Sequence, residues 1–268
     1  MNRQSHVARS IDGTPIQYEV HGTGATALVF VHGWCCDRHY WDQQVAHFAP
    51  HYTVVLLDLA GHGASGQDRI EWTISAFGQD VVAVVTHLGL KQVVLIGHSL
   101  GGPTIVEAAR HLPTAVIGVV GVDTWSDIEQ TRTPEQVAAA VAPFRANFVE
   151  TARVVARTLF VPTSEPALLE RVVAAMAATP PQIGIGTAEA LASNGRNLRE
   201  GLQEIKAPMI AINADSFGAT NVEMAQRYGI EVVLMSGVGH FVMLEDPETF
   251  NRLLAAAVRR CMQAKARS

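Results

Sequence analysis

A chain of 268 residues, 48% hydrophobic and 17% charged, is long enough for one large domain with a substantial core. The formal net charge is −5 without a basic patch, so nucleic acid is not an expected partner. No apolar run has the length of a membrane span, and the first residues lack the apolar core of a signal peptide. Two of the three cysteines are the adjacent pair Cys35 and Cys36, which argues against a disulfide framework and favours a cytoplasmic protein.

Eight stretches rich in apolar and β-branched residues are the expected strands. They cover residues 7–12, 14–21, 25–31, 52–57, 93–96, 115–122, 208–212 and 231–235. Helical patterns at 40–48, 73–88 and 103–112 alternate with the central strands, and two more helices are expected at 221–228 and 247–262. This alternation predicts an α/β fold with a mostly parallel, doubly wound sheet.

The alternation stops between the sixth and seventh strands. Residues 126–205 contain helical patterns only, among them 163–178, 187–203 and a helix opened by cap-like residues at 133–136. An insertion of this size predicts a helical cap over the carboxyl edge of the sheet. The expected organisation is therefore a core of residues 1–125 and 206–268 with a cap of residues 126–205.

The segment that organises the chain is Gly97–Gly101, which reads Gly-His-Ser-Leu-Gly. A buried strand precedes it and a helix follows it, the context in which this pattern indicates a nucleophile elbow. The sharp turn would hold Ser99 in a strained conformation and expose its Oγ at the N-terminus of a helix. Amide groups and the helix dipole at that position favour developing negative charge.

A serine nucleophile needs a base, and the base needs a carboxylate that fixes its tautomer. Catalytic groups in open α/β sheets lie beyond the carboxyl ends of the strands. His240 follows the last strand and is the expected base. Asp215 follows the seventh strand and gives the chain order Ser, Asp, His, so it is the expected acid. Asp123 ends the strand next to the elbow and is the alternative acid, whereas Asp58 is expected to be structural.

The expected oxyanion hole consists of two backbone N–H groups. One belongs to Leu100, directly after the nucleophile, and the other to Trp34 or, one place on, Cys35, in the loop after the third strand. The substrate is expected in a mostly apolar cleft between Ser99 and the cap. The aromatic residues expected to line this cleft, beside Trp34, are Trp125, Phe144, Phe148, Phe160 and Phe241.

Four motifs together resemble the α/β-hydrolase superfamily over residues 14–261: His32–Trp34, Asp58–Ser65, Gly97–Gly102 and Gly237–Phe241. The resemblance implies a serine esterase or lipase-like enzyme with a helical cap, acting through an acyl-enzyme without a metal or other cofactor. The expected substrate is a small, mostly apolar carboxylic ester, and the protein is expected to be a monomer or homodimer that does not bind membranes.

Several alternative functions use the same three catalytic side chains but act on a different type of bond. A lactonase, a thioesterase, a C–C bond hydrolase and a perhydrolase all fit this sequence. A small-molecule sensor of the same fold with slow turnover is the alternative from a different functional class. The side chains that the cap presents to the substrate decide among these functions. The sequence pattern of the cap does not show which side chains these are.

Overall fold

The structure, a computed structural model, describes residues 5–216, 218 and 220–267. Its centre is an eight-stranded sheet with the strand order β1-β2-β4-β3-β5-β6-β7-β8. The strands are β1 (Ser5–Arg9), β2 (Pro15–His21), β3 (Ala27–Val31), β4 (Thr53–Leu57), β5 (Val93–His98), β6 (Val116–Val122), β7 (Met209–Ala214) and β8 (Ile230–Met235). β2 runs antiparallel to its neighbours β1 and β4, and the other neighbouring strands are parallel. The predicted mostly parallel sheet of eight strands is confirmed.

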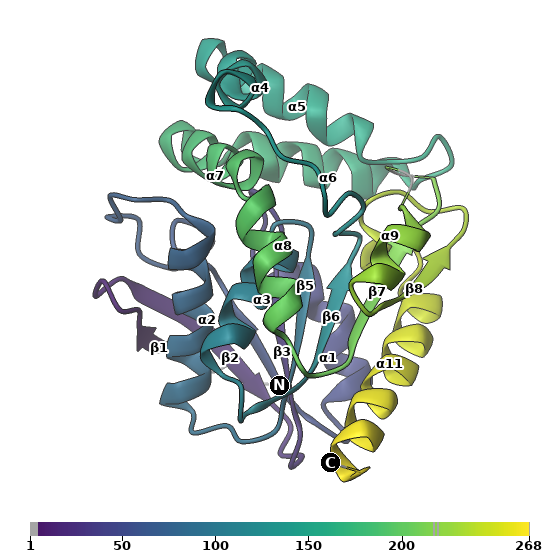
Figure 1. Ribbon diagram of the computed structural model, residues 1–268. Coiled ribbons are helices and arrows are strands. Elements are labelled where there is room, and N and C mark those ends of the chain that lie inside the picture. The colour runs from purple at the N-terminus through teal and green to yellow at the C-terminus, as the bar shows by residue number, and fades with distance from the viewer. Residues whose placement is uncertain (1–4, 217, 219, 268) are drawn as a thin grey trace.

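Helices cover both faces of this sheet (Figure 1). A 3-10 turn η1 (Arg38–Trp41) leads into α1 (Asp42–Phe48), which packs on one face with α11 (Pro247–Arg267). The other face packs against α2 (Ile74–His87) and α3 (Gly101–His111). Successive β5 side chains therefore enter two different cores, which explains why its sequence is continuously apolar. Along the chain, the short helix α9 (Val222–Arg227) precedes β8 and the short helix α10 (Val242–Glu245) follows it.

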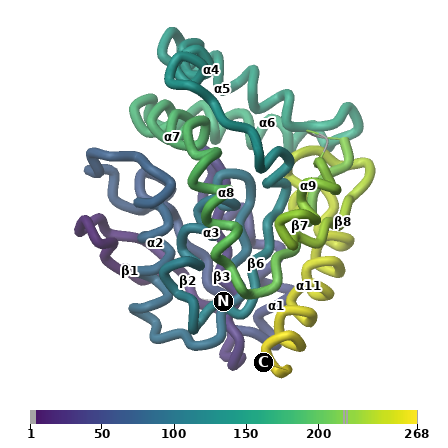
Figure 2. Tube along the Cα trace, in the orientation of Figure 1, coloured from purple at the N-terminus to yellow at the C-terminus, as the bar shows by residue number. Residues whose placement is uncertain are grey.

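Five helices separate β6 from β7: α4 (Pro134–Ala146), α5 (Phe148–Thr158), α6 (Pro166–Ala177), α7 (Pro181–Ser193) and α8 (Gly195–Glu204). Figures 1 and 2 show α4–α7 as a layer across one end of the sheet, and α8 running back beside α3. α8 packs against α3, although it lies inside the range expected for the cap. The name cap is used below for α4–α7.

Local sequence signals account for some boundaries and not for others. Thr133 and Gln136 form the reciprocal capping box that their spacing predicts at the start of α4. The helix expected at 187–203 is instead split between α7 and α8. α8 begins at Gly195, which lies against the segment before α4. A Cβ at residue 195 would stand 2.0 Å from the carbonyl oxygen of Gln130. Within the part of the chain that the structure describes, no helix combines the length and apolar character needed to cross a bilayer.

Candidate active site

Ser99 occupies a strained turn between β5 and α3. Its φ is 52°, in the left-handed region that a residue with a side chain rarely adopts. The turn is fixed from both sides, because Ser99 N–H donates to the Val122 carbonyl at 3.0 Å and Gly102 N–H donates to the Ser99 carbonyl at 2.8 Å. A Cβ on Gly101 would lie 2.5 Å from the Val31 carbonyl oxygen, so the helix approaches β3 only with glycine there. This geometry is the sharp strand-to-helix turn that the sequence predicts around Ser99.

His240 and Asp123 form a buried pair beside the elbow. His240 follows β8, and its Nδ1 lies 2.5 Å from Asp123 Oδ2. Each residue is only 7% exposed. The other carboxylate oxygen, Oδ1, accepts a hydrogen bond from Ala214 N–H at 2.8 Å. Asp123 is thereby held between the end of β7 and the imidazole, and it can keep the Nδ1–H tautomer of His240 in place.

The expectation that Asp215 orients His240 is wrong in this structure. Asp215 is exposed, and its Oδ2 accepts a hydrogen bond from Ser236 Oγ at 2.5 Å. The strands that carry Asp123 and Asp215 are neighbours, but the loop after β8 brings His240 to β6 rather than to β7. Asp58 has the expected structural role, since it accepts hydrogen bonds from Arg38 N–H and Ala64 N–H at 2.8 and 2.9 Å.

Backbone strain concentrates at this edge of the sheet. Four non-glycine residues have positive φ among those that the structure describes: Cys35, Ser99, Asp123 and Trp125. They follow β3, β5 and β6, the three adjacent central strands whose carboxyl ends meet there. Strained residues persist where the surrounding packing over-determines them, and they cluster at functional sites.

The loop after β3 lies directly against the elbow. A Cβ on Gly33 would stand 3.2 Å from Ser99 Cβ and 2.7 Å from His98 Nδ1. The next residue, Trp34, is anchored to the cap, because its Nε1–H donates to the Gly184 carbonyl at 2.8 Å. Leu100 is buried at the start of α3, directly after Ser99. The backbone amides expected to form the oxyanion hole thus belong to segments that adjoin Ser99.

His98 is packed among these loops and is buried. Its Nε2 lies 3.0 Å from the His240 carbonyl oxygen, and the two imidazole centroids are 4.5 Å apart. Burial, reinforced by the neighbouring His240, holds the pKa of His98 well below its usual value. A neutral His98 ring therefore donates from Nε2 to the backbone carbonyl of His240.

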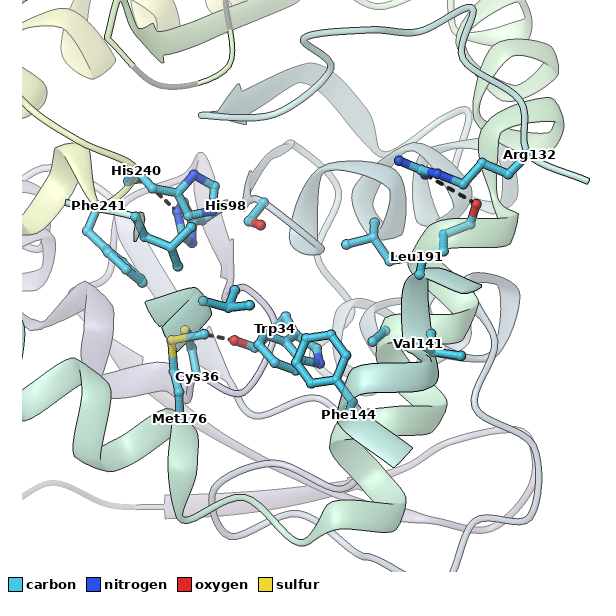
Figure 3. A pocket seen from close by; sticks show the side chains of 16 residues that line it. Trp34, Cys36, His98, Arg132, Val141, Phe144, Met176, Leu191, His240 and Phe241 are labelled. Carbon is cyan, nitrogen blue, oxygen red and sulfur yellow. Dashed lines mark hydrogen bonds between the residues drawn. The ribbon is translucent and has the colours of Figure 1, made fainter. Parts of the chain in front are cut away.

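A cavity of about 330 Å³ opens at Ser99 and His240. Its walls come from the elbow, the loops after β3 and β8, and the cap, as the labelled residues of Figure 3 show. The lining residues are Trp34, Cys36, His98, Ser99, Arg132, Ala140, Val141, Phe144, Val155, Leu159, Met176, Ala188, Leu191, Ala192, His240 and Phe241. Most of these side chains are apolar, as expected for a site that takes apolar substrates.

Of the five predicted pocket aromatics, Phe144 and Phe241 line this cavity. Phe148 and Phe160 do not, because both support lining residues from behind. Phe148 packs on the Trp34 ring at 6.2 Å between centroids, and Phe160 stacks on Phe241 at 5.3 Å. Trp125 instead borders a second cavity of about 190 Å³ that also reaches Ser99, Asp123 and His240.

Sequence reasoning missed the contribution of α7 and of the segment before α4. Ala188, Leu191 and Ala192 of α7 and Arg132 line the larger cavity. Their spacing in α7 is the ordinary helical period, which does not distinguish a residue facing a cavity from one facing a core. Among the described residues, no group of three His, Cys, Asp or Glu side chains is arranged to hold a metal ion.

A family model described as "Alpha/beta hydrolase family" matches residues 28–253, most of the chain. The chain belongs to the alpha/beta hydrolase family. Family membership places it among hydrolases and agrees with the sheet order, the elbow and the inserted cap described above.

Individual relatives of this hydrolase carry different activities. It is 27% identical to 3-oxoadipate enol-lactonase 2 of Acinetobacter baylyi over 252 residues, which cover 87% of the chain and 89% of the relative. An esterase from Thermogutta terrifontis has a TM-score of 0.82 at 21% identity, covering 96% of this chain and 99% of the esterase. The enol-lactonase from Burkholderia xenovorans has a TM-score of 0.82 at 23% identity, covering 95% and 100% of the two chains. At these identities the two solved structures establish the fold alone.

Proposed function

We propose that this hydrolase cleaves carboxylic esters with Ser99 as nucleophile, His240 as general base and Asp123 as the acid that orients it. The observation that carries the proposal is the 2.5 Å contact between His240 Nδ1 and Asp123 Oδ2, in a cavity that the strained Ser99 shares with His240. With its proton on Nδ1, His240 presents the Nε2 lone pair as the acceptor of the serine proton.

The proposed reaction proceeds through an acyl-enzyme without a cofactor. Ser99 Oγ attacks the ester carbonyl carbon while His240 accepts its proton, and the N–H groups of Trp34 and Leu100 stabilise the oxyanion. The tetrahedral intermediate expels the alcohol, which takes the proton from His240. His240 then removes a proton from water, the resulting hydroxide attacks the acyl carbon, and Ser99 Oγ leaves with that proton while the acid departs.

Replacement of the nucleophile tests the proposal. We expect Ser99→Ala to lower kcat for a short-chain p-nitrophenyl ester by roughly 10³-fold or more, because no other group can form the acyl-enzyme. A fluorophosphonate probe should add covalently to the wild type and leave the mass of Ser99→Ala unchanged. The matched control is Ser236→Ala, at the same edge of the sheet but bonded to Asp215, which should behave as the wild type. Equal turnover by the wild type and Ser99→Ala would rule the mechanism out.

A lactone is the second candidate substrate, favoured by the near full-length similarity to an enol-lactonase. A lactone is a cyclic ester, so the same three side chains would open it, with the alcohol remaining attached to the acyl group. We expect a pH-indicator assay to separate the two candidates. A kcat/KM for small lactones that exceeds the values for open-chain alkyl esters of equal size would favour the lactonase.

A further inference from the structure

Among the described residues that line the 330 Å³ cavity, Arg132 is the only Lys, Arg, Asp or Glu. It lies just before α4, whose N-cap is Thr133, in the segment that joins β6 to the cap. In Figure 3 it extends over the cavity from the side opposite His240 and Phe241. The remaining walls present no carboxylate and no lysine, so an apolar chamber has one cationic group at its margin.

The interactions of Arg132 within the described protein leave most of its donors available. Its guanidinium donates one hydrogen bond, at 3.5 Å, to the Ala192 carbonyl in the last turn of α7. That distance is at the outer limit for a hydrogen bond. Ion pairs link other arginines of the cap to carboxylates, for example Arg145 to Glu189 at 2.5 Å and Arg157 to Glu170 at 2.6 Å. No carboxylate of the described residues forms such a pair with Arg132.

A guanidinium presents five N–H donors in a planar fork that matches the two oxygens of a carboxylate. We propose that Arg132 is a specificity-determining residue that binds a carboxylate carried by the substrate at the end away from the reacting ester. This inference rests on the proposed esterase function and names its substrate class: an ester or lactone with an apolar body and one free carboxylate. Arg132 is distant in sequence from Ser99 and His240, and only the folded chain brings its side chain to their cavity.

Arg132 also has a possible structural role, because cations near the last carbonyls of a helix stabilise it. The two roles make different predictions. A structural role changes the turnover of all substrates together, whereas carboxylate binding changes the preference between an anionic and a neutral substrate. Arg132→Gln separates them, since the amide can still donate to Ala192 but carries no charge.

The experiment compares mono-p-nitrophenyl adipate with p-nitrophenyl hexanoate, which have acyl chains of equal length and differ in the terminal carboxylate. Adipate is chosen because shorter diacid esters form cyclic anhydrides spontaneously. For the wild type we expect kcat/KM to be higher for the adipate ester, with the difference mainly in KM. Arg132→Gln should lower the ratio of the two kcat/KM values about tenfold, the typical effect of losing a charge-assisted hydrogen bond at an exposed site. Arg132→Lys should restore part of it.

The matched control is Arg145→Gln, which removes an exposed cap arginine outside the cavity lining and should leave the ratio as in the wild type. A ratio unchanged in Arg132→Gln, or equal losses for both esters with a lowered Tm, would overturn the inference while leaving the esterase function intact. Hydrolysis of neither ester by the wild type would overturn the esterase function together with the inference that rests on it.

Discussion

Both carboxylate oxygens of Asp123 are engaged, and each has a different donor. Oδ1 accepts from Ala214 N–H, a backbone donor that cannot move without breaking the end of β7, and Oδ2 faces His240 Nδ1. An asparagine in this position would keep its carbonyl oxygen toward Ala214 and turn its NH₂ toward His240. The imidazole would then have to accept at Nδ1 and carry its proton on Nε2, where it could not act as a base.

We therefore predict that Asp123→Asn lowers kcat on a p-nitrophenyl ester by roughly 10²- to 10⁴-fold while the circular dichroism spectrum is unchanged. Asp215→Asn is the control, because Asp215 is exposed and bonded to Ser236, and its kcat should stay within about twofold of the wild type. The reverse result, a large loss in Asp215→Asn and a small one in Asp123→Asn, would show that His240 turns to the other strand during catalysis.

The sequence predicts Ser99 and His240 as nucleophile and base, but it pairs His240 with Asp215 where the structure pairs it with Asp123. The reason is geometric. A nucleophile elbow is a local signal, since the strand, the flanking glycines and the helix are contiguous. Asp123 and Asp215 each directly follow a buried strand, and those strands are neighbours in the sheet. Which of them reaches His240 depends on the path of the loop after β8 and on the left-handed backbone at Asp123, with φ of 43°, neither of which has a local pattern.

The cap supports the catalytic loops as well as covering them. The N–H of His240 donates to the Leu159 carbonyl, just after α5, at 2.7 Å, and Trp34 Nε1–H donates to Gly184 in α7. The loops that carry His240 and Trp34 are thus each hydrogen-bonded to the cap. A displacement of the cap by a few tenths of an ångström is therefore expected to affect turnover as well as binding.

Gly239→Ala tests this coupling at the contact between the cap and the base. A Cβ at residue 239 would stand 2.4 Å from the Leu159 carbonyl oxygen and 2.9 Å from Phe160 Cα, so one of the two segments must shift. We expect kcat to fall at least about tenfold, since misplaced catalytic groups lose much of their effect. The measurement is kcat on a p-nitrophenyl ester, with Tm as the control for global unfolding. Full activity with an unchanged Tm would show that the contact is dispensable.

Strands and cap helices differ in how far their surroundings can be predicted. A strand that is apolar at every position must be covered on both sides, so the layered core around β5 follows from its sequence. A cap helix needs only one apolar stripe, and the stripe does not reveal its partner. Phe144 lines the cavity and Phe148 supports it from behind, although both are aromatic and only four residues apart.

For the whole molecule, three buried histidines make stability depend on pH. Burial lowers the pKa of His62 to about 3, and it also lowers the pKa values of His32 and His98. The unfolded chain binds protons on these side chains below about pH 6.5, whereas the folded chain binds them only at lower pH. Their contribution to stability is therefore complete above pH 6.5 and is lost as the pH falls from 6.5 toward 3.

We predict that the free energy of unfolding falls between pH 6.5 and 4.5, with a slope of about 1.4 kcal/mol per pH unit from His62 and a further decrease from His32 and His98. Carboxylates with lowered pKa values, such as Asp12 at about 2, act mainly below this range. Urea unfolding at several pH values measures this slope. His62→Gln should make the slope smaller by about 1.4 kcal/mol per pH unit, which corresponds to one proton. A free energy that is constant over this range would show that the histidines protonate in the folded protein.

The chain leaves the sheet after β6 and returns to it on β7, the strand hydrogen-bonded to β6. The two ends of the intervening segment are therefore fixed side by side, whatever its length, and the register of the sheet does not depend on what lies between them. Ser99 and Asp123 precede this segment and His240 follows it, whereas most of the cavity wall lies within it. Reaction chemistry and substrate preference can accordingly be inherited separately. An exchange of this one segment between two family members would transfer a preference without rebuilding the catalyst.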